Sequence, residues 1–415
     1  MEQFVVDQIR SGLKYLPANL AKSYFIKNTN AETIAFRSKG FICGVCHPNE
    51  NFSQLKEANI DWIRIDIPYP YEPDGSISTH YNSFKEKCSR FHNHGIKVMA
   101  VTPYPRDYIA DGADVRTDAG RKKLKAVAEF LAKDLQNDVD AFQITNEMGI
   151  PHFTLPLTMN EAIQFIALHL ETIYPIKGRL LIGYNSAGPQ ADLHAGLKPY
   201  LQYVDYVGVD IYVGCFDTIP GAMWMFDSLL RYLWSFTKKP LLLQEFGYIS
   251  GGKPKTKKEK RAVLQTYGYS SEAEAAKEPD VFVERLPETL KKHVKHVCKN
   301  DPDRYADLLF RSDLKNHFYR ELPVITKIPG YEHTPEGQAK FYADILPHLY
   351  SLPYVCGSII YCYMDSDRCY ICGQNDCPTE TRWGLVDCAG SPKPSFYAVK
   401  KAFGRIQWED RVSDQ

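Results

Sequence analysis

Two apolar stretches of the sequence each stop at a polar residue that is followed by a glutamate. Residues 142–151 (FQITNEMGIP) are apolar until Asn146 and Glu147, and residues 240–248 (PLLLQEFGY) are apolar until a glutamine and Glu245. A single glutamate at the end of an apolar run is most often solvated or salt-bridged. Two such endings on separate segments instead suggest a pair of carboxyl groups, which can perform general acid and nucleophilic chemistry.

Hydrolysis of a glycosidic bond uses such a pair. One carboxylic acid protonates the leaving oxygen while a carboxylate opposite attacks the anomeric carbon, and in a retaining enzyme the two groups lie about 5–5.5 Å apart. Their surroundings have to separate their pKa values, so that the acid stays protonated and the nucleophile stays ionised. Both glutamates must therefore be held by elements whose ends meet.

Short apolar runs alternate with amphipathic helical patterns along the chain. The runs that we expect to be strands are residues 40–45, 61–67, 96–102, 141–146, 179–185, 204–212, 240–246 and 357–365. They are apolar throughout, as strands covered on both faces are. Eight such strand–helix units predict a (β/α)8 TIM barrel, with a doubly wound open sheet as the alternative. In the barrel, Glu147 ends the fourth strand and Glu245 the seventh, and both project into its mouth.

The predicted barrel occupies residues 40–403, between a helical N-terminal extension over 1–39 and a C-terminal tail over 404–415. A long segment over residues 250–333 separates the seventh strand from its helix. A loop of this length is usually functional or a small subdomain. Its position after a strand places it on the C-terminal face of the barrel, where active sites lie.

Composition limits the classes of partner. The chain has 415 residues, 44% of them apolar, and its 50 Lys and Arg balance its 50 Asp and Glu. No overall field favours nucleic acid or an anionic membrane, so we expect neither as a partner. The first 25 residues contain no continuous apolar segment, which predicts neither a secretory nor a membrane-spanning start. With eleven cysteines, an odd number in no regular framework, the sequence favours a cytoplasmic location.

The two strand endings carry a resemblance to a known group. The motifs ITNE and QEFG, on the fourth and seventh of eight predicted strands, resemble those of the retaining glycoside hydrolases of clan A. The resemblance, which covers roughly residues 40–403, implies that Glu147 is the general acid/base and Glu245 the nucleophile. It also implies that Asn146 hydrogen-bonds the 2-hydroxyl of the substrate sugar.

Other positions extend the resemblance or depart from it. Arg64 in WIRIDIP is similar to an arginine near the nucleophile, and Tyr212 in GVDIY to a tyrosine that donates to it. Arg64 could alternatively pair with Asp66 or Asp210 in a structural role, and Tyr212 could be an ordinary aromatic at the rim. Asp210 stands where relatives often carry His or Asn, and we interpret it as a binding or charge-network group.

Aromatic residues follow several of the predicted strands, as the binding of sugar C–H faces would require. The best candidates for a stacking platform are Tyr361, which stands where the clan usually has a tryptophan, and Trp383. Further candidates are Tyr69, Tyr71, Tyr104, Trp224 and Tyr248.

Four cysteines near the C-terminus have metal-ligand spacing. Cys369, Cys372 and Cys377 form a C-x2-C-x4-C pattern, and Cys388 follows. Four thiolates could hold a structural zinc that pins the loop after the last strand, while the alternative is a set of reduced, unlinked cysteines. The CGVC motif at 43–46 could in principle contribute a ligand. No cofactor is expected for catalysis itself.

The sequence therefore predicts a cytoplasmic retaining glycosidase that cleaves β-linked oligosaccharides or β-glycosides through a covalent intermediate; the same residues would also support transglycosylation. Two alternatives stay open. One is a catalytically silent carbohydrate-binding barrel, which would normally have lost one of the two acids. The other is a metal-dependent sugar-processing barrel enzyme, such as an isomerase, which would need several histidines at its strand ends.

Overall fold

The structure is a computed structural model that describes residues 29–413 except 216–220, 313 and 323–326. Near the N-terminus it also describes residues 10, 12–15, 21, 23 and 25. Most of the predicted N-terminal extension therefore lies outside the described residues. Its described part includes helix α2 (Ala31–Arg37), which the side chain of Asn30 caps by accepting from the Thr33 backbone N–H.

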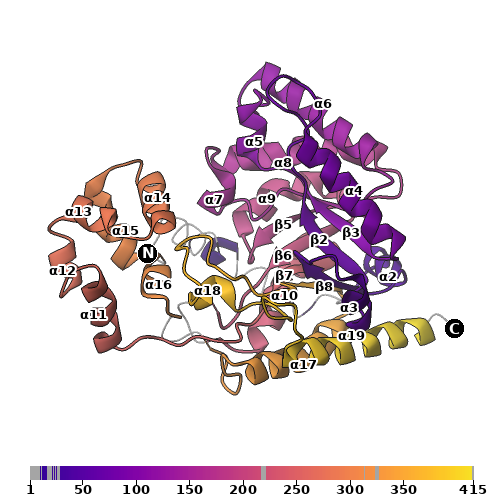
Figure 1. The fold of residues 1–415 in the computed structure, drawn as a ribbon. Coiled ribbons are helices and arrows are strands. Elements are labelled where there is room, and N and C mark those ends of the chain that lie inside the picture. The colour runs from indigo at the N-terminus through magenta and orange to yellow at the C-terminus, as the bar shows by residue number, and fades with distance from the viewer. Residues whose placement is uncertain are drawn as a thin grey trace.

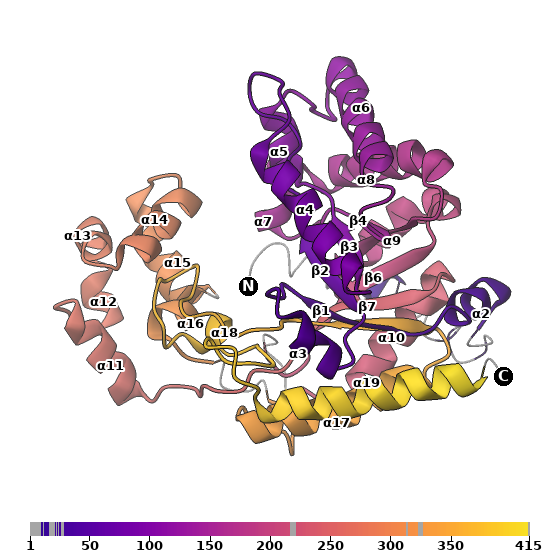
Figure 2. The ribbon, with the colours of Figure 1, turned by 45° about the vertical axis from the view of Figure 1, so that its right-hand side comes forward.

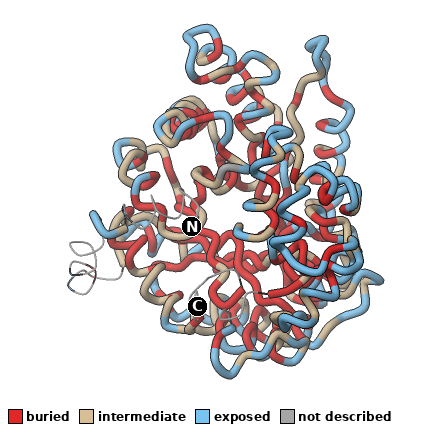
Figure 3. The backbone as a smooth tube through the Cα atoms, turned by 90° about the vertical axis from the view of Figure 1, so that its left-hand side faces the viewer, coloured by how far each residue is buried: buried red, intermediate tan, exposed pale blue. Residues whose placement is uncertain are grey.

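Eight parallel strands close into a barrel in chain order, which confirms the predicted (β/α)8 TIM fold. The strands are β1 (Ile42–Cys46), β2 (Trp62–Asp66), β3 (Lys97–Val101), β4 (Ala141–Ile144), β5 (Leu181–Ala187), β6 (Tyr206–Asp210), β7 (Leu241–Phe246) and β8 (Val355–Ile360). Each overlaps one of the eight apolar runs. The strands are buried while the outward faces of the helices are exposed (Figure 3), which explains the uninterrupted apolar pattern.

The helices that cover the barrel are α3 (Phe52–Glu57), α4 (Thr79–Asn93), α5 (Pro105–Ala110), α6 (Asp118–Asp134), α7 (Pro151–Thr154), α8 (Met159–Ile173), α9 (Ala191–Leu197), α10 (Trp224–Thr237), α17 (Pro335–Ser351) and α19 (Pro394–Ser413), with 3-10 turns at Tyr174–Ile176 and Lys198–Tyr203. Thr158 and Glu161 form a capping box at the start of α8. The boundary predicted at residue 403 falls inside α19, which lies beside α17 (Figures 1 and 2). Among the described residues, no helix is long and apolar enough to cross a membrane.

The connection between β7 and α17 forms a lobe beside the barrel (Figures 1 and 2). Its helices are α11 (Lys257–Thr266), α12 (Glu272–Ala275), α13 (Pro279–Glu284), α14 (Glu288–Val297), α15 (Tyr305–Arg311) and α16 (Leu314–Tyr319), with a 3-10 turn at Pro302–Arg304. The lobe has an apolar core of its own, which includes Phe282, Leu290 and Phe318. Three cysteines of the loop after β8 belong to the same core, so that loop and the lobe pack as one unit.

Candidate active site

Glu245 lies at the C-terminal end of β7, and both of its carboxylate oxygens accept hydrogen bonds. Arg64 Nη1 lies 2.5 Å from Oε1, and the Tyr212 hydroxyl donates to Oε2 at 2.6 Å. The Glu245 residue is only 7% exposed. Burial and the adjacent Glu245 raise the pKa of Tyr212, so this hydroxyl keeps its proton and stays a donor. The carboxylate is thus held at both oxygens by donors from other parts of the chain.

Arg64 links the ends of two other strands, β1 and β4, to this carboxylate. Its guanidinium, 1% exposed, donates from Nε to Gln143 Oε1 at 2.7 Å and from Nη2 to Asn146 Oδ1 at 2.7 Å. Its third polar contact is the sulfur of Cys46, 3.7 Å from Nη1. The ion pair of Arg64 is thus with Glu245 and not with the aspartates considered as alternatives. A planar, five-donor group suits such a multidentate role.

Glu147 follows β4 and differs from Glu245 in its surroundings. Its backbone has a φ of +42°, and Thr145 has a φ of +52°. This left-handed conformation is uncommon for residues other than glycine, and it clusters at functional sites. The Glu147 backbone N–H is held by Asn185 Oδ1 at 2.9 Å. Burial, and then repulsion from Glu245, raise the pKa of Glu147 to about 8, which favours a protonated acid at neutral pH.

Asn146 is oriented by three donors that meet at one oxygen. Its Oδ1 accepts from Arg64 and also from Gln143 Nε2 at 3.0 Å and Asn185 Nδ2 at 2.8 Å. Because the oxygen is occupied, the amide N–H groups are what Asn146 can offer a ligand. The geometry is compatible with donation to a sugar hydroxyl.

Gln143 and Asn185 are functional candidates that the sequence reasoning missed. Gln143 lies in the middle of β4 and Asn185 in β5, and both side chains are buried in this network. A signal existed, because a buried amide inside an apolar strand needs hydrogen-bond partners. Which partners it finds depends on strand register, which the sequence does not reveal.

Asp210 ends β6 beside Glu245. Its Oδ2 accepts from Asn185 Nδ2 at 2.6 Å, while Oδ1 is buried and has no hydrogen-bond partner among the described residues. Burial, and then the carboxyl groups of Glu245 and Glu147, raise the pKa of Asp210. A neutral Asp210 is therefore favoured. A neutral carboxylic acid is similar in shape and hydrogen bonding to the asparagine that clan members often carry at this position.

Three aromatic rings pack together beside Glu245. The rings of Tyr212 and Trp383 have centroids 5.2 Å apart, and those of Tyr361 and Trp383 lie 5.8 Å apart, both edge to face. Gly247 permits this packing, because a Cβ there would lie 2.3 Å from the Tyr361 carbonyl oxygen and 3.0 Å from the Trp383 ring. Trp383 is 1% exposed. The expectation of an open sugar platform at Trp383 needs correction, since its ring is covered and serves to position Tyr361 and Tyr212. Tyr361 is half-buried, and its role as a sugar platform stays a prediction.

The remaining aromatic candidates have different surroundings. Tyr248 is buried, and its hydroxyl donates to the Tyr331 carbonyl at 2.6 Å, which makes it a packing residue. Trp224 is 66% exposed at the start of α10. Tyr69 donates to Asp111 and packs edge to face with Tyr71. The ring of Tyr104 stacks on Phe153 of α7.

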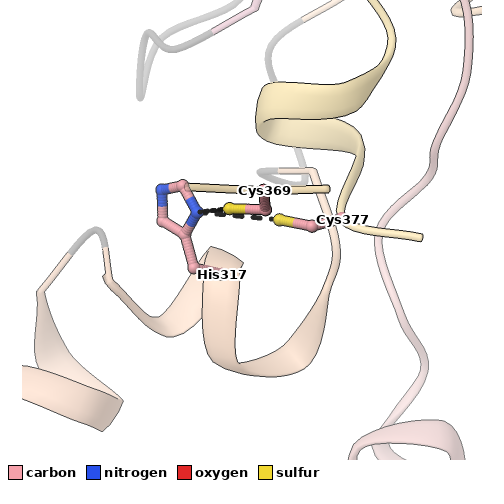
Figure 4. Close-up of side chains that lie close together, drawn as sticks. All are labelled: His317, Cys369 and Cys377. Atoms are coloured by element: carbon pink, nitrogen blue, oxygen red, sulfur yellow. Dashed lines mark hydrogen bonds between the residues drawn. The ribbon is translucent and has the colours of Figure 1, made fainter. Parts of the chain in front are cut away.

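The cysteine cluster has a different fourth member from the one predicted. Cys369, Cys372 and Cys377 lie together and are buried, whereas Cys388 is exposed. The additional member is His317 of α16 (Figure 4). No sequence signal pointed to it, because it belongs to the lobe and lies 52 residues from Cys369. The CGVC motif lies in β1, where Cys46 contacts Arg64.

Comparison with known proteins supports the fold. No protein-family model matches the chain, and no similar sequence was found among curated proteins. Solved structures do match. A β-glucuronidase from Bacteroides uniformis is 13% identical with a TM-score of 0.52, and the match covers 88% of this chain and 35% of that one. A family 39 glycoside hydrolase from Bacteroides cellulosilyticus is 14% identical with a TM-score of 0.51, covering 90% of this chain and 65% of that one.

A β-glucuronidase from Parabacteroides merdae is also similar, at 12% identity and a TM-score of 0.51, over 88% of this chain and 37% of that one. This chain thus spans between about a third and two thirds of the length of these three proteins. At such identities the likeness shows the fold alone. The chain has the barrel fold of glycoside hydrolases, as the motif resemblance predicted.

Proposed function

We propose that the protein is a retaining glycosidase that cleaves β-linked oligosaccharides or β-glycosides. One observation carries the proposal: two carboxyl groups at the ends of β4 and β7 have opposite electrostatic surroundings. Glu245 is held by the Arg64 guanidinium and the Tyr212 hydroxyl. Glu147 has a pKa raised to about 8. A carboxyl group kept protonated by burial suits the role of general acid, and a carboxylate oriented by two donors suits the role of nucleophile.

In the first step, Glu147 donates its proton to the glycosidic oxygen as the bond between that oxygen and the anomeric carbon breaks. The carboxylate of Glu245 forms a new bond to the same carbon from the opposite face, and the aglycone leaves as an alcohol. Negative charge on Glu245 decreases during attack, so Arg64 and Tyr212 have to orient the carboxylate without preventing its reaction. Both donors reach Glu245 from other strands, so they fix its position before the substrate arrives.

In the second step, the ionised Glu147 takes a proton from a water molecule as that water attacks the anomeric carbon. The bond to Glu245 breaks, the nucleophile returns to its ionised state, and the sugar is released with its original configuration. An acceptor alcohol in place of water would give transglycosylation with the same proton transfers. We assign Asn146 to donation to the 2-hydroxyl of the sugar, a role supported by its Oδ1, which accepts three hydrogen bonds from the protein and leaves the amide N–H groups for a ligand.

The similarity to β-glucuronidases guides the choice of substrates to test without assigning the sugar. A panel of aryl β-glycosides should contain glucuronides as well as neutral hexosides and pentosides. Phenols of low pKa leave without protonation by the general acid. Aryl glycosides of such phenols therefore depend on the nucleophile but not on the acid, which distinguishes the two carboxyl roles. We expect wild-type protein to release the β-anomer first. Time-resolved proton NMR measures which anomer appears first.

Two variants and a control make the assignment specific. With azide and an activated aryl substrate, Glu245→Ala should form the α-glycosyl azide, and Glu147→Ala should form the β-glycosyl azide. Glu171→Ala, which removes an exposed carboxylate from the outer helix α8, should behave as wild type. Initial release of the α-anomer would contradict retention. Binding of glycosides with no turnover on any substrate would instead favour the silent carbohydrate-binding barrel.

A further inference from the structure

The side chains of His317, Cys369, Cys372 and Cys377 form a compact group outside the active site. The ligand atoms of His317, Cys369 and Cys377 all lie within 4.8 Å of one another (Figure 4). Cys372 is buried in the same core beside Cys369 and Cys377. The three cysteines are buried and His317 is largely so. Three thiols and an imidazole thus converge in a region closed to solvent.

The spacing of these atoms matches a shared metal ion. His317 Nδ1 lies 3.4 Å from Cys369 Sγ and 3.6 Å from Cys377 Sγ. A tetrahedral zinc with Zn–S bonds of about 2.3 Å and Zn–N bonds of about 2.0–2.1 Å holds its nitrogen and sulfur ligands about 3.5 Å apart. Both measured distances agree with this separation, and the Thr379 hydroxyl lies 3.3 Å from the same nitrogen.

The loop around the cysteines has the features of a metal-binding turn. The Cys372 backbone N–H donates to Cys369 Sγ at 3.4 Å, and the Gly373 N–H donates to the Cys369 carbonyl at 2.8 Å. Gly373 has a φ of +72°, which lets the chain reverse after the C-x2-C pair. The Thr379 hydroxyl lies 2.9 Å from Cys377 Sγ, where it can donate to a thiolate. Such outer-shell donors orient the ligands of metal sites.

We propose that His317, Cys369, Cys372 and Cys377 bind a structural zinc ion. Three soft thiolates and one imidazole in a closed tetrahedral set are typical of structural zinc sites, and the burial leaves no open position for a substrate. Cys388, which the sequence pattern offered as a fourth ligand, is exposed and has no place in the set.

The site joins two parts of the chain that are distant in sequence. His317 belongs to α16 of the lobe, whereas the cysteines lie between β8 and the short helix α18 (Pro378–Thr381). Helices α16 and α18 lie side by side in both ribbon views (Figures 1 and 2). The zinc therefore fastens the lobe to the loop after β8. That loop continues directly into Trp383, whose indole N–H donates to the Thr379 carbonyl at 2.8 Å.

The test is metal analysis of the full-length chain, purified under reducing conditions from zinc-supplemented medium. We expect inductively coupled plasma mass spectrometry to find one zinc per chain. Cobalt(II) exchanged into the protein should show the visible bands of a tetrahedral site and a sulfur-to-metal charge-transfer band. X-ray absorption of the zinc-loaded wild type should report three sulfur ligands and one nitrogen ligand, a result that requires no variant to fold.

The matched variants are His317→Ala, Cys372→Ser and Cys388→Ser. The first two should lose at least tenfold in zinc retained against a competing chelator, and Cys388→Ser should retain zinc as wild type does. Wild type without stoichiometric metal and without a cobalt–thiolate spectrum would overturn the proposal. So would a four-sulfur shell with zinc lost in Cys388→Ser, or a thiol titration that finds two of the eleven cysteines joined in a disulfide in the cluster.

Discussion

Arg64 Nη1 lies 2.5 Å from Glu245 Oε1, so the guanidinium of β2 is paired with the carboxylate of β7 through the interior of the barrel mouth. The pair is buried, and Arg64 also donates hydrogen bonds to the side-chain oxygens of Gln143 and Asn146. One side chain thereby orients the proposed nucleophile and fixes the amide beside the proposed acid. The two halves of the site are coupled through Arg64, which gives the first prediction.

Arg64→Leu should lower the free energy of unfolding by about 3–5 kcal/mol, because removing one partner of a buried ion pair leaves an uncompensated charge. Urea denaturation of wild type and variant measures this difference. Arg64→Lys restores the charge without the planar fork, so it should recover part of the stability, while its kcat/KM should stay below that of wild type. Equal stability of Arg64→Leu and wild type would contradict the burial argument.

Tyr212→Phe tests the second donor to Glu245. The phenylalanine ring keeps the packing against Trp383, while the bond of the hydroxyl to Oε2 is lost. A hydrogen bond to a charged group contributes about 1.5–3 kcal/mol, so kcat should fall by about 10- to 100-fold. The control is Tyr397→Phe, which removes an exposed hydroxyl on α19. An unchanged kcat would show that this hydroxyl does not act on the nucleophile.

The raised pKa of Glu147 predicts how activity depends on pH. The general acid has to be protonated, so kcat/KM should fall as the pH rises through about 8. Glu147→Gln should remove this alkaline limb, and its remaining activity should be greatest on aryl substrates with good leaving groups. A wild-type profile that is flat to pH 10 would contradict the role.

The same shift predicts a trend in stability. A carboxyl whose pKa is raised from 4.5 to about 8 on folding contributes its full stabilisation below 4.5. That contribution is lost as the pH rises through about 8, because the fold disfavours the ionised form. The melting temperature of Glu147→Gln minus that of wild type should therefore be larger at pH 9.5 than at pH 6. Calorimetry across this range measures the difference, and a constant difference would refute the linkage.

Asp210→Asn tests whether the third carboxyl group is neutral. An asparagine can still accept from Asn185 Nδ2, and its own amide N–H groups replace the proton of the carboxylic acid. We therefore expect folding and activity at neutral pH to stay within a few-fold of wild type, with improved stability at alkaline pH because the raised pKa is removed. Asp210→Ala removes one of the two acceptors of Asn185 Nδ2, the other being Asn146 Oδ1, and should be clearly less stable. A 100-fold loss of kcat in Asp210→Asn would show that the ionised form is required.

The sequence was sufficient for those features that follow from chain order. In a parallel barrel the C-terminal ends of all strands face one side, so locating eight apolar runs already brings Glu147 and Glu245 to one mouth. Arg64 and Tyr212 could be placed for the same reason. Their contacts with Glu245 could not be predicted in this way, because the register of β7 shifts between Leu243 and Phe246, next to Glu245 itself.

Other features depend on tertiary contacts that have no local pattern. Asn185 of β5 accepts from the Glu147 backbone N–H and donates to Asp210, and these contacts depend on how the neighbouring strands lie in space. His317 meets the cysteines only because the lobe folds back on the loop after β8. Trp383 follows a strand as an exposed platform would, yet its ring is covered by neighbours that the sequence does not identify.

Gly247→Ala tests whether the close approach of β7 to the loop after β8 is needed for the site. The added methyl group would lie 2.3 Å from the Tyr361 carbonyl oxygen, so backbone has to move, and the rings of Tyr361 and Trp383 move with it. Overpacking of this kind costs about 1–3 kcal/mol in stability, and a displaced Tyr361 should raise KM and lower kcat together. Gly251→Ala is a matched control on the same segment, because its nearest atom would be 3.6 Å away, an ordinary contact. Steady-state kinetics and thermal melts of the two variants provide the comparison. Equal behaviour of both would show that the glycine in the QEFG motif is not required for this packing, whereas loss in Gly247→Ala alone would show that the motif positions the aromatic residues as well as the nucleophile.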